Sequence, residues 1–208
     1  MLNLLRKDFI ALKSSLWTTL MYLVVFSVVF IPKHSSSIHL VGIYTAFGTL
    51  SLATMIDIKN HNHNFLVTLP VSRKQIIKAK YITAIICTLF GVIASYGIHS
   101  LVQMTYPGLN KPDLTVMDIL GPAAIVIAMT AIYLPLFYSL SKKGTSIING
   151  VFFLILIFIA QPTALMMNMI HEKGLQSNPT LYLILTGILL LFIASYFLTA
   201  AMFTRKDL

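Results

Sequence analysis

Long uncharged apolar runs alternate with short polar segments along the whole chain. Six runs contain no Lys, Arg, Asp or Glu, and they cover residues 14–32, 38–56, 81–104, 119–140, 146–170 and 181–204. A helix of about 20 apolar residues spans the hydrocarbon core of a bilayer. Backbone groups in lipid must be paired within their own segment, so each run is expected to be helical. The pattern predicts an all-α integral membrane protein with six transmembrane helices.

Two places modify this pattern. Leu2, Leu5, Phe9, Leu12 and Leu16 recur at helical spacing ahead of the first run, which predicts an interfacial helix over residues 1–13. In the fifth run, Gln161-Pro162 is expected to end or kink the helix, because proline lacks a backbone N–H and clashes with the preceding turn. The fifth span is therefore predicted to cover residues 146–165.

The composition agrees with this pattern. Of the 208 residues, 57% are hydrophobic and 10% are charged, and the mean hydropathy is +0.86. Soluble domains carry about 25% charged residues, so a soluble globular enzyme is excluded. The single cysteine, Cys87, cannot form an internal disulfide.

The net charge of +9 would suggest a nucleic-acid partner in a soluble protein, but here its distribution follows the spans. Twelve of the 15 Lys and Arg residues fall on one side of the predicted membrane, and only Lys33, Lys111 and Lys173 fall on the other. By the positive-inside rule both termini are cytoplasmic. We therefore expect a multi-pass protein of the cell membrane that contacts the lipid bilayer and binds no nucleic acid.

The cytoplasmic segment 57–80 is longer and more mixed than the other connections. Pro70 is expected to stop a short helix that precedes it. Ser72 and Gln75 have the spacing of a capping box, which predicts a second helix that runs through Lys80 into the third span.

This segment has two interpretations. Its lysines are typical of a solvated loop that meets lipid headgroups. The apolar residues 65–67 weigh against a purely solvated loop, because they need a cover, either lipid headgroups or another protein.

Three stretches now carry a resemblance to a known family. They are LLRKDF at residues 4–9, LPVSRK at 69–74 with Lys80-Tyr81 opening the third span, and FTRKDL at 203–208. With the six-span plan, they resemble the small ABC-2-type permease subunits of bacterial ABC transporters. The chain is similar to the membrane subunits of the phenol-soluble modulin exporter within that group.

The resemblance implies that the helix within segment 57–80 is a coupling helix that docks on a cytoplasmic ABC ATPase subunit. The contact residues it implies are His61, Asn62, His63, Asn64, Phe65, Leu66, Leu69, Pro70, Ser72 and Arg73. The chain would hold no cofactor, because ATP and Mg²⁺ bind to the partner ATPase. It would work as a homodimer or as a heterodimer with a second permease.

No catalytic motif is present in the sequence. G-x-x-x-x-G-K-[ST], H-E-x-x-H and G-x-S-x-G are all absent, so we predict a non-catalytic membrane subunit. His61 and His63 are two residues apart and point to different sides of a helix, so no metal site is predicted. His39 and His99 lie near the outer ends of spans, where interfacial hydrogen bonds explain them.

A transport route needs polar groups within the spans. The candidates are Tyr44, Tyr96, Thr130, Tyr133, Asn149 and Gln161, all uncharged. Each of them is also explained by contacts between helices, as are the small residues Gly42, Ala46, Gly91, Ser95 and Gly187. A route without fixed charge suits an amphipathic or hydrophobic substrate, for example a toxin or antimicrobial peptide.

The predicted function is therefore that of a permease subunit of an ABC exporter. One alternative is a stand-alone secondary transporter or channel, for which an intramembrane ionisable residue or inverted repeats would be expected. A second alternative is a membrane immunity protein that binds a peptide without transporting it.

Overall fold

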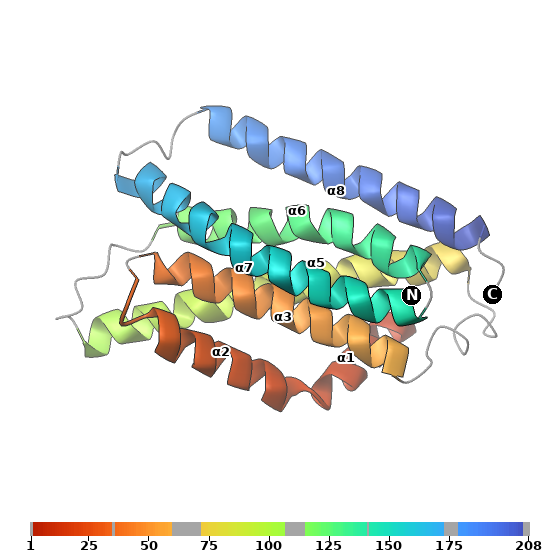
Figure 1. Cartoon of the computed structure of the whole chain (residues 1–208), viewed down its shortest axis with the longest axis horizontal. Coiled ribbons are helices and arrows are strands. Elements are labelled where there is room, and N and C mark those ends of the chain that lie inside the picture. The colour runs from red at the N-terminus through yellow and green to blue at the C-terminus, as the bar shows by residue number, and fades with distance from the viewer. Residues whose placement is uncertain are drawn as a thin grey trace.

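Seven α-helices form all the regular secondary structure in the residues that the computed structural model describes, which are 2–34, 36–59, 72–106, 115–140, 142–172 and 179–205. They are α1 Leu2–Lys13, α2 Leu16–Phe30, α3 Ser37–Lys59, α5 Arg73–Thr105, α6 Met117–Ser139, α7 Lys142–Glu172 and α8 Pro179–Arg205. All except the short α1 run side by side along the long axis of the molecule (Figure 1). The start of α1, the end of α3, the start of α5 and the end of α8 lie at the same end of this bundle.

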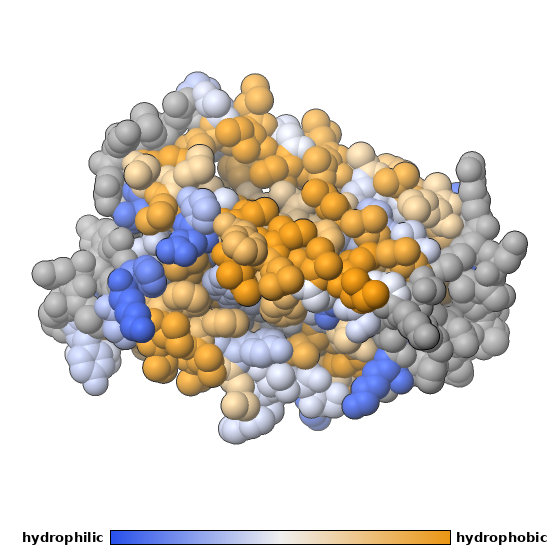
Figure 2. Space-filling model, viewed as in Figure 1, coloured by the Kyte–Doolittle hydropathy of each residue, from blue (hydrophilic) through white to orange (hydrophobic). Residues whose placement is uncertain are grey.

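Five of the described helices, α3, α5, α6, α7 and α8, are long and apolar enough to cross a membrane. A sixth span results if α1 and α2, which meet at an angle of 62°, are taken as one broken span. On the face shown in Figure 2, apolar side chains cover much of the middle, and the most hydrophilic ones lie toward the two ends. The predicted all-α membrane protein is confirmed.

The helix within the first predicted span begins at Leu16, two residues after the expected start, because the chain bends at Ser14-Ser15. The hydroxyl of Ser14 donates to the carbonyl oxygen of Ala11 at 2.6 Å, and the Ser15 amide donates to Leu12 O at 2.8 Å. Serine side chains that bond to the local backbone compete with helix propagation. The uncharged run 14–32 thus holds the bend at Ser14-Ser15, helix α2 and the two residues that follow it.

The packed face of α1 includes a charged residue. Leu4 and Asp8 are buried, whereas Phe9, which we expected on the same apolar face as Leu5 and Leu12, is 47% exposed. Because an acidic residue lies on the packed face, the pattern of hydrophobic residues in the sequence does not reveal this face.

The fifth predicted span continues past Pro162 instead of stopping near residue 165. Helix α7 includes Pro162 and runs to Glu172. In the adjacent turn the hydroxyl of Thr163 donates to the carbonyl oxygens of Ile159 and Ala160, at 2.8 and 2.9 Å. Hydroxyl side chains and neighbouring helices commonly compensate the backbone around proline in membrane helices.

Helix α3 lies at the centre of the bundle and is the most buried of the five long helices. It approaches α5 closely at Gly91, where an added Cβ would lie 2.4 Å from the Cα of Ala46. The predicted helix contact at Gly91 and Ala46 is therefore confirmed. Within the described part of this chain, Gly187 makes no such contact, because nothing outside its own helix lies within 4 Å of an added Cβ there.

Candidate functional site

Four charged side chains meet at the end of the bundle where α3 ends and α5 begins. Lys7 and Asp8 come from α1, Asp57 from the last turns of α3 and Lys80 from α5. Exposure is 6% for Asp8, 3% for Asp57 and 7% for Lys80. We call these four residues the charge cluster.

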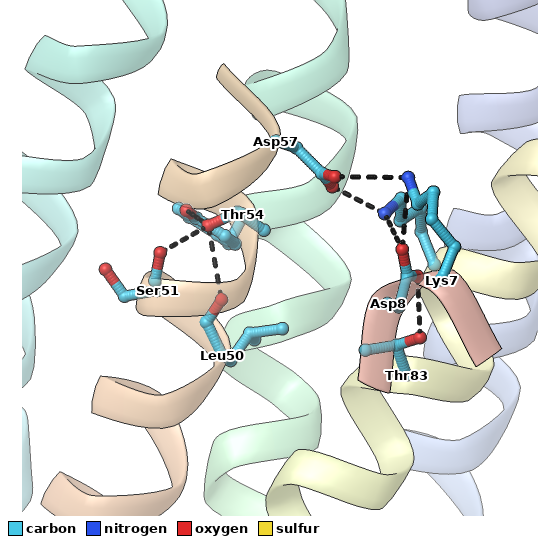
Figure 3. A network of polar contacts seen from close by, with 9 residues as sticks. Lys7, Asp8, Leu50, Ser51, Thr54, Asp57 and Thr83 are labelled. Atoms are coloured by element: carbon cyan, nitrogen blue, oxygen red, sulfur yellow. Dashed lines mark hydrogen bonds and ion pairs between the residues drawn. The ribbon is translucent and has the colours of Figure 1, made fainter. Parts of the chain in front are cut away.

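Lys80 is the central member of the charge cluster. Its Nζ donates to Asp8 Oδ1 at 2.7 Å and lies 2.5 Å from Asp57 Oδ2. Lys7 Nζ lies 3.3 Å from Asp8 Oδ1 and 3.5 Å from Asp57 Oδ1, at the more exposed edge. The hydroxyl of Thr83, one turn beyond Lys80, donates to Asp8 Oδ2 at 3.0 Å. Figure 3 shows Asp57 on α3 facing Lys7 and Asp8 on α1.

The electrostatics of the charge cluster balance only when all four members are present. Two carboxylates held this close repel each other unless cations lie between them. Two lysines and two aspartates have no formal net charge, and each carboxylate has an ammonium neighbour. Because removal of one partner from a buried ion pair costs about 3–5 kcal/mol, the cluster fixes α1 against α3 and α5.

A small cavity of about 10 Å³ lies against the charge cluster, which is room for about one water molecule. Its walls include Leu50 and Thr54 of α3 and Leu134 and Tyr138 of α6. The charged groups therefore adjoin a small space of mixed polar and apolar lining that reaches toward α6.

Segment 57–80 is described only at its two flanks. The predicted ATPase contacts His61, Asn62, His63, Asn64, Phe65, Leu66, Leu69 and Pro70 lie outside the described residues. At the second flank, the Ser72 hydroxyl accepts from the Gln75 amide at 3.3 Å, so the predicted N-cap is confirmed. Helix α5 then continues unbroken through Lys80 to Thr105.

Arg73 links the same flank to the last helix. Its Nη1 donates to the carbonyl oxygens of Thr204 and Phe203, at 3.1 and 3.4 Å. The final carbonyls of a helix lack partners within the helix and carry a partial negative charge, so a guanidinium stabilises them. Helix α5, which follows segment 57–80, thus contacts α8 through Arg73 and contacts α1 and α3 through Lys80.

Two of the predicted route residues are brought together in a second polar network. Tyr133 of α6 hydrogen-bonds to Thr54 of α3 at 2.7 Å and donates to Asn149 Oδ1 of α7 at 3.3 Å. The hydroxyl of Ser51 donates to the same oxygen at 2.6 Å. These four buried side chains connect α3, α6 and α7 through hydrogen bonds alone.

The other four route candidates lie elsewhere. Tyr44 stacks on the rings of Phe26 and Phe30, and the Thr130 hydroxyl donates to Val126 O within its own helix at 2.6 Å. Tyr96 is half-buried on α5, and Gln161 is exposed on α7.

At the opposite end of the bundle, the two histidines have polar partners, as the sequence predicted. His99 Nε2 lies 3.0 Å from Ser37 Oγ, and His39 Nε2 lies 3.5 Å from Asp118 Oδ1. The carboxylate of Asp118 also accepts from the amide of Thr115 at 2.7 Å.

The sequence interpretation missed the charge cluster. Lys80 was counted among the basic residues of the cytoplasmic side without a predicted partner, and Asp8 was not singled out. The available signal was the spacing of Leu4, Asp8 and Leu12, which places a carboxylate on the face of α1 between two leucines.

The family model for the ABC-2 family transporter protein matches residues 3–204. The chain therefore belongs to the ABC-2 transporter family, and it is a membrane permease component of an ABC transporter. The family implies partnership with an ABC ATPase, and its members are membrane transport subunits that are generally non-catalytic. No curated protein and no solved structure matches the chain.

Proposed function

We propose that this chain is the permease subunit of an ABC exporter and that a separate ATPase drives it through segment 57–80. The observation that carries the proposal is the position of Lys80. Its ammonium group joins α5 to Asp57 of α3, and these two helices flank the segment on which the ATPase would act. The same ammonium group holds Asp8 of α1.

The mechanism follows from this connection. Closure of the ATPase dimer on ATP would displace segment 57–80, and its two flanking helices would receive the force directly. Helices tied by buried ion pairs resist separation, so α1, α3 and α5 would tilt together. Rigid-body rotation of such a unit is a common form of switching between two states.

Assembly and orientation complete the proposal. The excess of basic residues at one side supports an orientation with both termini in the cytoplasm, and we propose the cell membrane as the location. One chain has too few helices for a two-halved pore, so it would pair with a second copy or with another permease. Family membership favours this over the stand-alone transporter and the immunity protein.

The substrate we propose is amphipathic or hydrophobic, with a toxin or antimicrobial peptide as an example. The network of Ser51, Thr54, Tyr133 and Asn149 offers hydroxyl and amide groups within the bundle and no charge. The likeness to the phenol-soluble modulin exporter stays a prediction and points to the same class of substrate.

The experiment is purification of the chain from its native membrane in mild detergent, with mass spectrometry of the proteins that accompany it. A P-loop ATPase is expected with the wild type and is expected to be lost from Phe65→Asp/Leu66→Asp. Phe65→Leu/Leu66→Met retains the apolar surface and is the matched control, so it should keep the ATPase. Equal recovery of the ATPase from all three proteins would refute docking through these residues, and its absence from folded wild type would refute the exporter.

A further inference from the structure

An apolar cavity of about 180 Å³ opens at the bend between α1 and α2. Its walls come from four helices and include Phe9 and Leu12 of α1 and Ile86 and Phe90 of α5. Lys13, the last residue of α1, also lines it. The cavity exists because the 62° bend turns α2 away from the direction of α1.

The surface beside this cavity has the chemistry of a helix at a membrane interface. Phe9 and Ile10 are 47% and 62% exposed, although both are large and apolar. Arg6 and Lys13 are also exposed and are seven residues apart, which places them on one face of the helix at a spacing of roughly 10 Å. Apolar side chains next to cationic ones are typical of interfacial helices that bind anionic lipids.

Within the described part of the chain, neither Arg6 nor Lys13 forms an ion pair with an acidic residue. There, the ion pairs of α1 are made by Lys7 and Asp8 with each other and with Asp57 and Lys80, on the opposite side of the helix. Lys13 therefore presents its charge at the mouth of an apolar cavity. The complementary ligand has a long hydrocarbon chain and an anionic head.

We propose that this cavity binds one acyl chain of an anionic membrane phospholipid and that Lys13 contacts the lipid phosphate, with Arg6 nearby on the same face. Apolar cavities of this kind are not stably filled by water, and a membrane supplies the hydrocarbon chain. The site is separate from segment 57–80, so it does not depend on how the ATPase docks.

The test uses the full chain in nanodiscs of phosphatidylcholine that contain a small amount of phosphatidylglycerol with a diazirine in one acyl chain. After illumination, mass spectrometry locates the labelled peptides. Labels are expected on residues 9–13 of α1 and 86–90 of α5. Unlabelled phosphatidylglycerol should displace the probe about fivefold better than phosphatidylcholine, the factor that one lysine near an anionic surface provides.

Matched variants distinguish the contribution of the lipid headgroup to labelling from that of the cavity. Lys13→Gln should lower labelling by the phosphatidylglycerol probe about fivefold and leave labelling by a phosphatidylcholine probe unchanged. Lys78→Gln removes the same charge from an exposed position on α5 that does not line the cavity, so it should change neither. Cys87→Leu adds volume to the cavity wall and should lower labelling by both probes.

Three results would overturn the proposal. The first is labelling spread evenly over the exposed faces of α7 and α8, without enrichment at the cavity. The second is equal labelling of wild type and Lys13→Gln by the phosphatidylglycerol probe. The third is a cavity that is protected from both lipids because a second copy of the chain covers it, which cross-linked peptides from two chains would reveal.

Discussion

The ammonium group of Lys80 lies 2.7 Å from a carboxylate oxygen of Asp8 and 2.5 Å from one of Asp57. One side chain of α5 thereby joins the first helix of the chain to the helix that leads into segment 57–80. This relationship makes Lys80 a positioning residue, and its removal should have effects on both stability and coupling.

Lys80→Met is expected to lower the free energy of unfolding by about 3–5 kcal/mol, because two buried carboxylates would then share only Lys7. Adding Asp57→Asn restores a balance of one cation and one anion, so the double variant should recover part of this loss. Denaturant unfolding in detergent measures both. Lys78→Met is the control, since Lys78 is exposed on the same helix. Wild-type stability of Lys80→Met would contradict the cluster's role.

Gly91→Ala is expected to destabilise the protein by about 1–3 kcal/mol, since overpacking forces neighbours to move. The new Cβ would lie 2.4 Å from backbone atoms of Ala46, which no rotamer change relieves. Gly97→Ala is the matched control on α5, where an added Cβ meets nothing within 4 Å. It should stabilise by up to about 1 kcal/mol, because glycine is a poor helix former. Equal melting temperatures for the two variants would argue against the close α3–α5 contact.

Arg73→Gln is expected to loosen the end of α8, because Phe203 O and Thr204 O lose their guanidinium donor. A cation at a helix C-terminus contributes about 0.3–1 kcal/mol, so amides near residue 204 should exchange hydrogen up to about fivefold faster. Hydrogen–deuterium exchange with mass spectrometry measures this. Lys74→Gln, at an exposed neighbouring position, should leave the exchange unchanged. A uniform increase over all helices would indicate general destabilisation instead.

Asn149→Leu and Gln161→Leu are expected to differ in their effect on stability. Their effects on the rate of transport are expected to be alike. Asn149 is buried and accepts hydrogen bonds from Ser51 and Tyr133, so its loss should destabilise by about 1 kcal/mol. Gln161 is exposed, so its replacement should leave stability unchanged. If both residues line the route, both variants should slow ATP-dependent uptake of a fluorescent amphipathic peptide by inverted vesicles. Wild-type uptake by both would remove them from the route.

Features set by local sequence were predicted well. The apolar runs indicated all the long helices, because any segment in lipid must pair its own backbone groups. Ser72 was recognised as an N-cap because its hydroxyl bonds only three residues along the chain. The close approach at Gly91 followed from the small-residue pattern of membrane helix interfaces.

Features that depend on a distant partner were not predictable in the same way. A lysine that faces headgroups and one that faces two buried carboxylates look alike in a sequence, so no buried partner was predicted for Lys80. Its partner Asp8 is 72 positions away. Pro162 was likewise expected to end or kink its helix, and the structure continues the helix through the turn around Thr163.

The short length of α2 has a consequence for the bilayer itself. Its 15 residues extend about 22 Å at the usual rise per residue, whereas the hydrocarbon core is about 30 Å thick. The neighbouring α3, with 23 residues, has no such deficit. A helix shorter than the hydrocarbon core is accommodated when the bilayer thins around it. We therefore expect the membrane to be locally thin beside α2, where an amphipathic substrate or a lipid would meet a lower barrier than elsewhere around the protein.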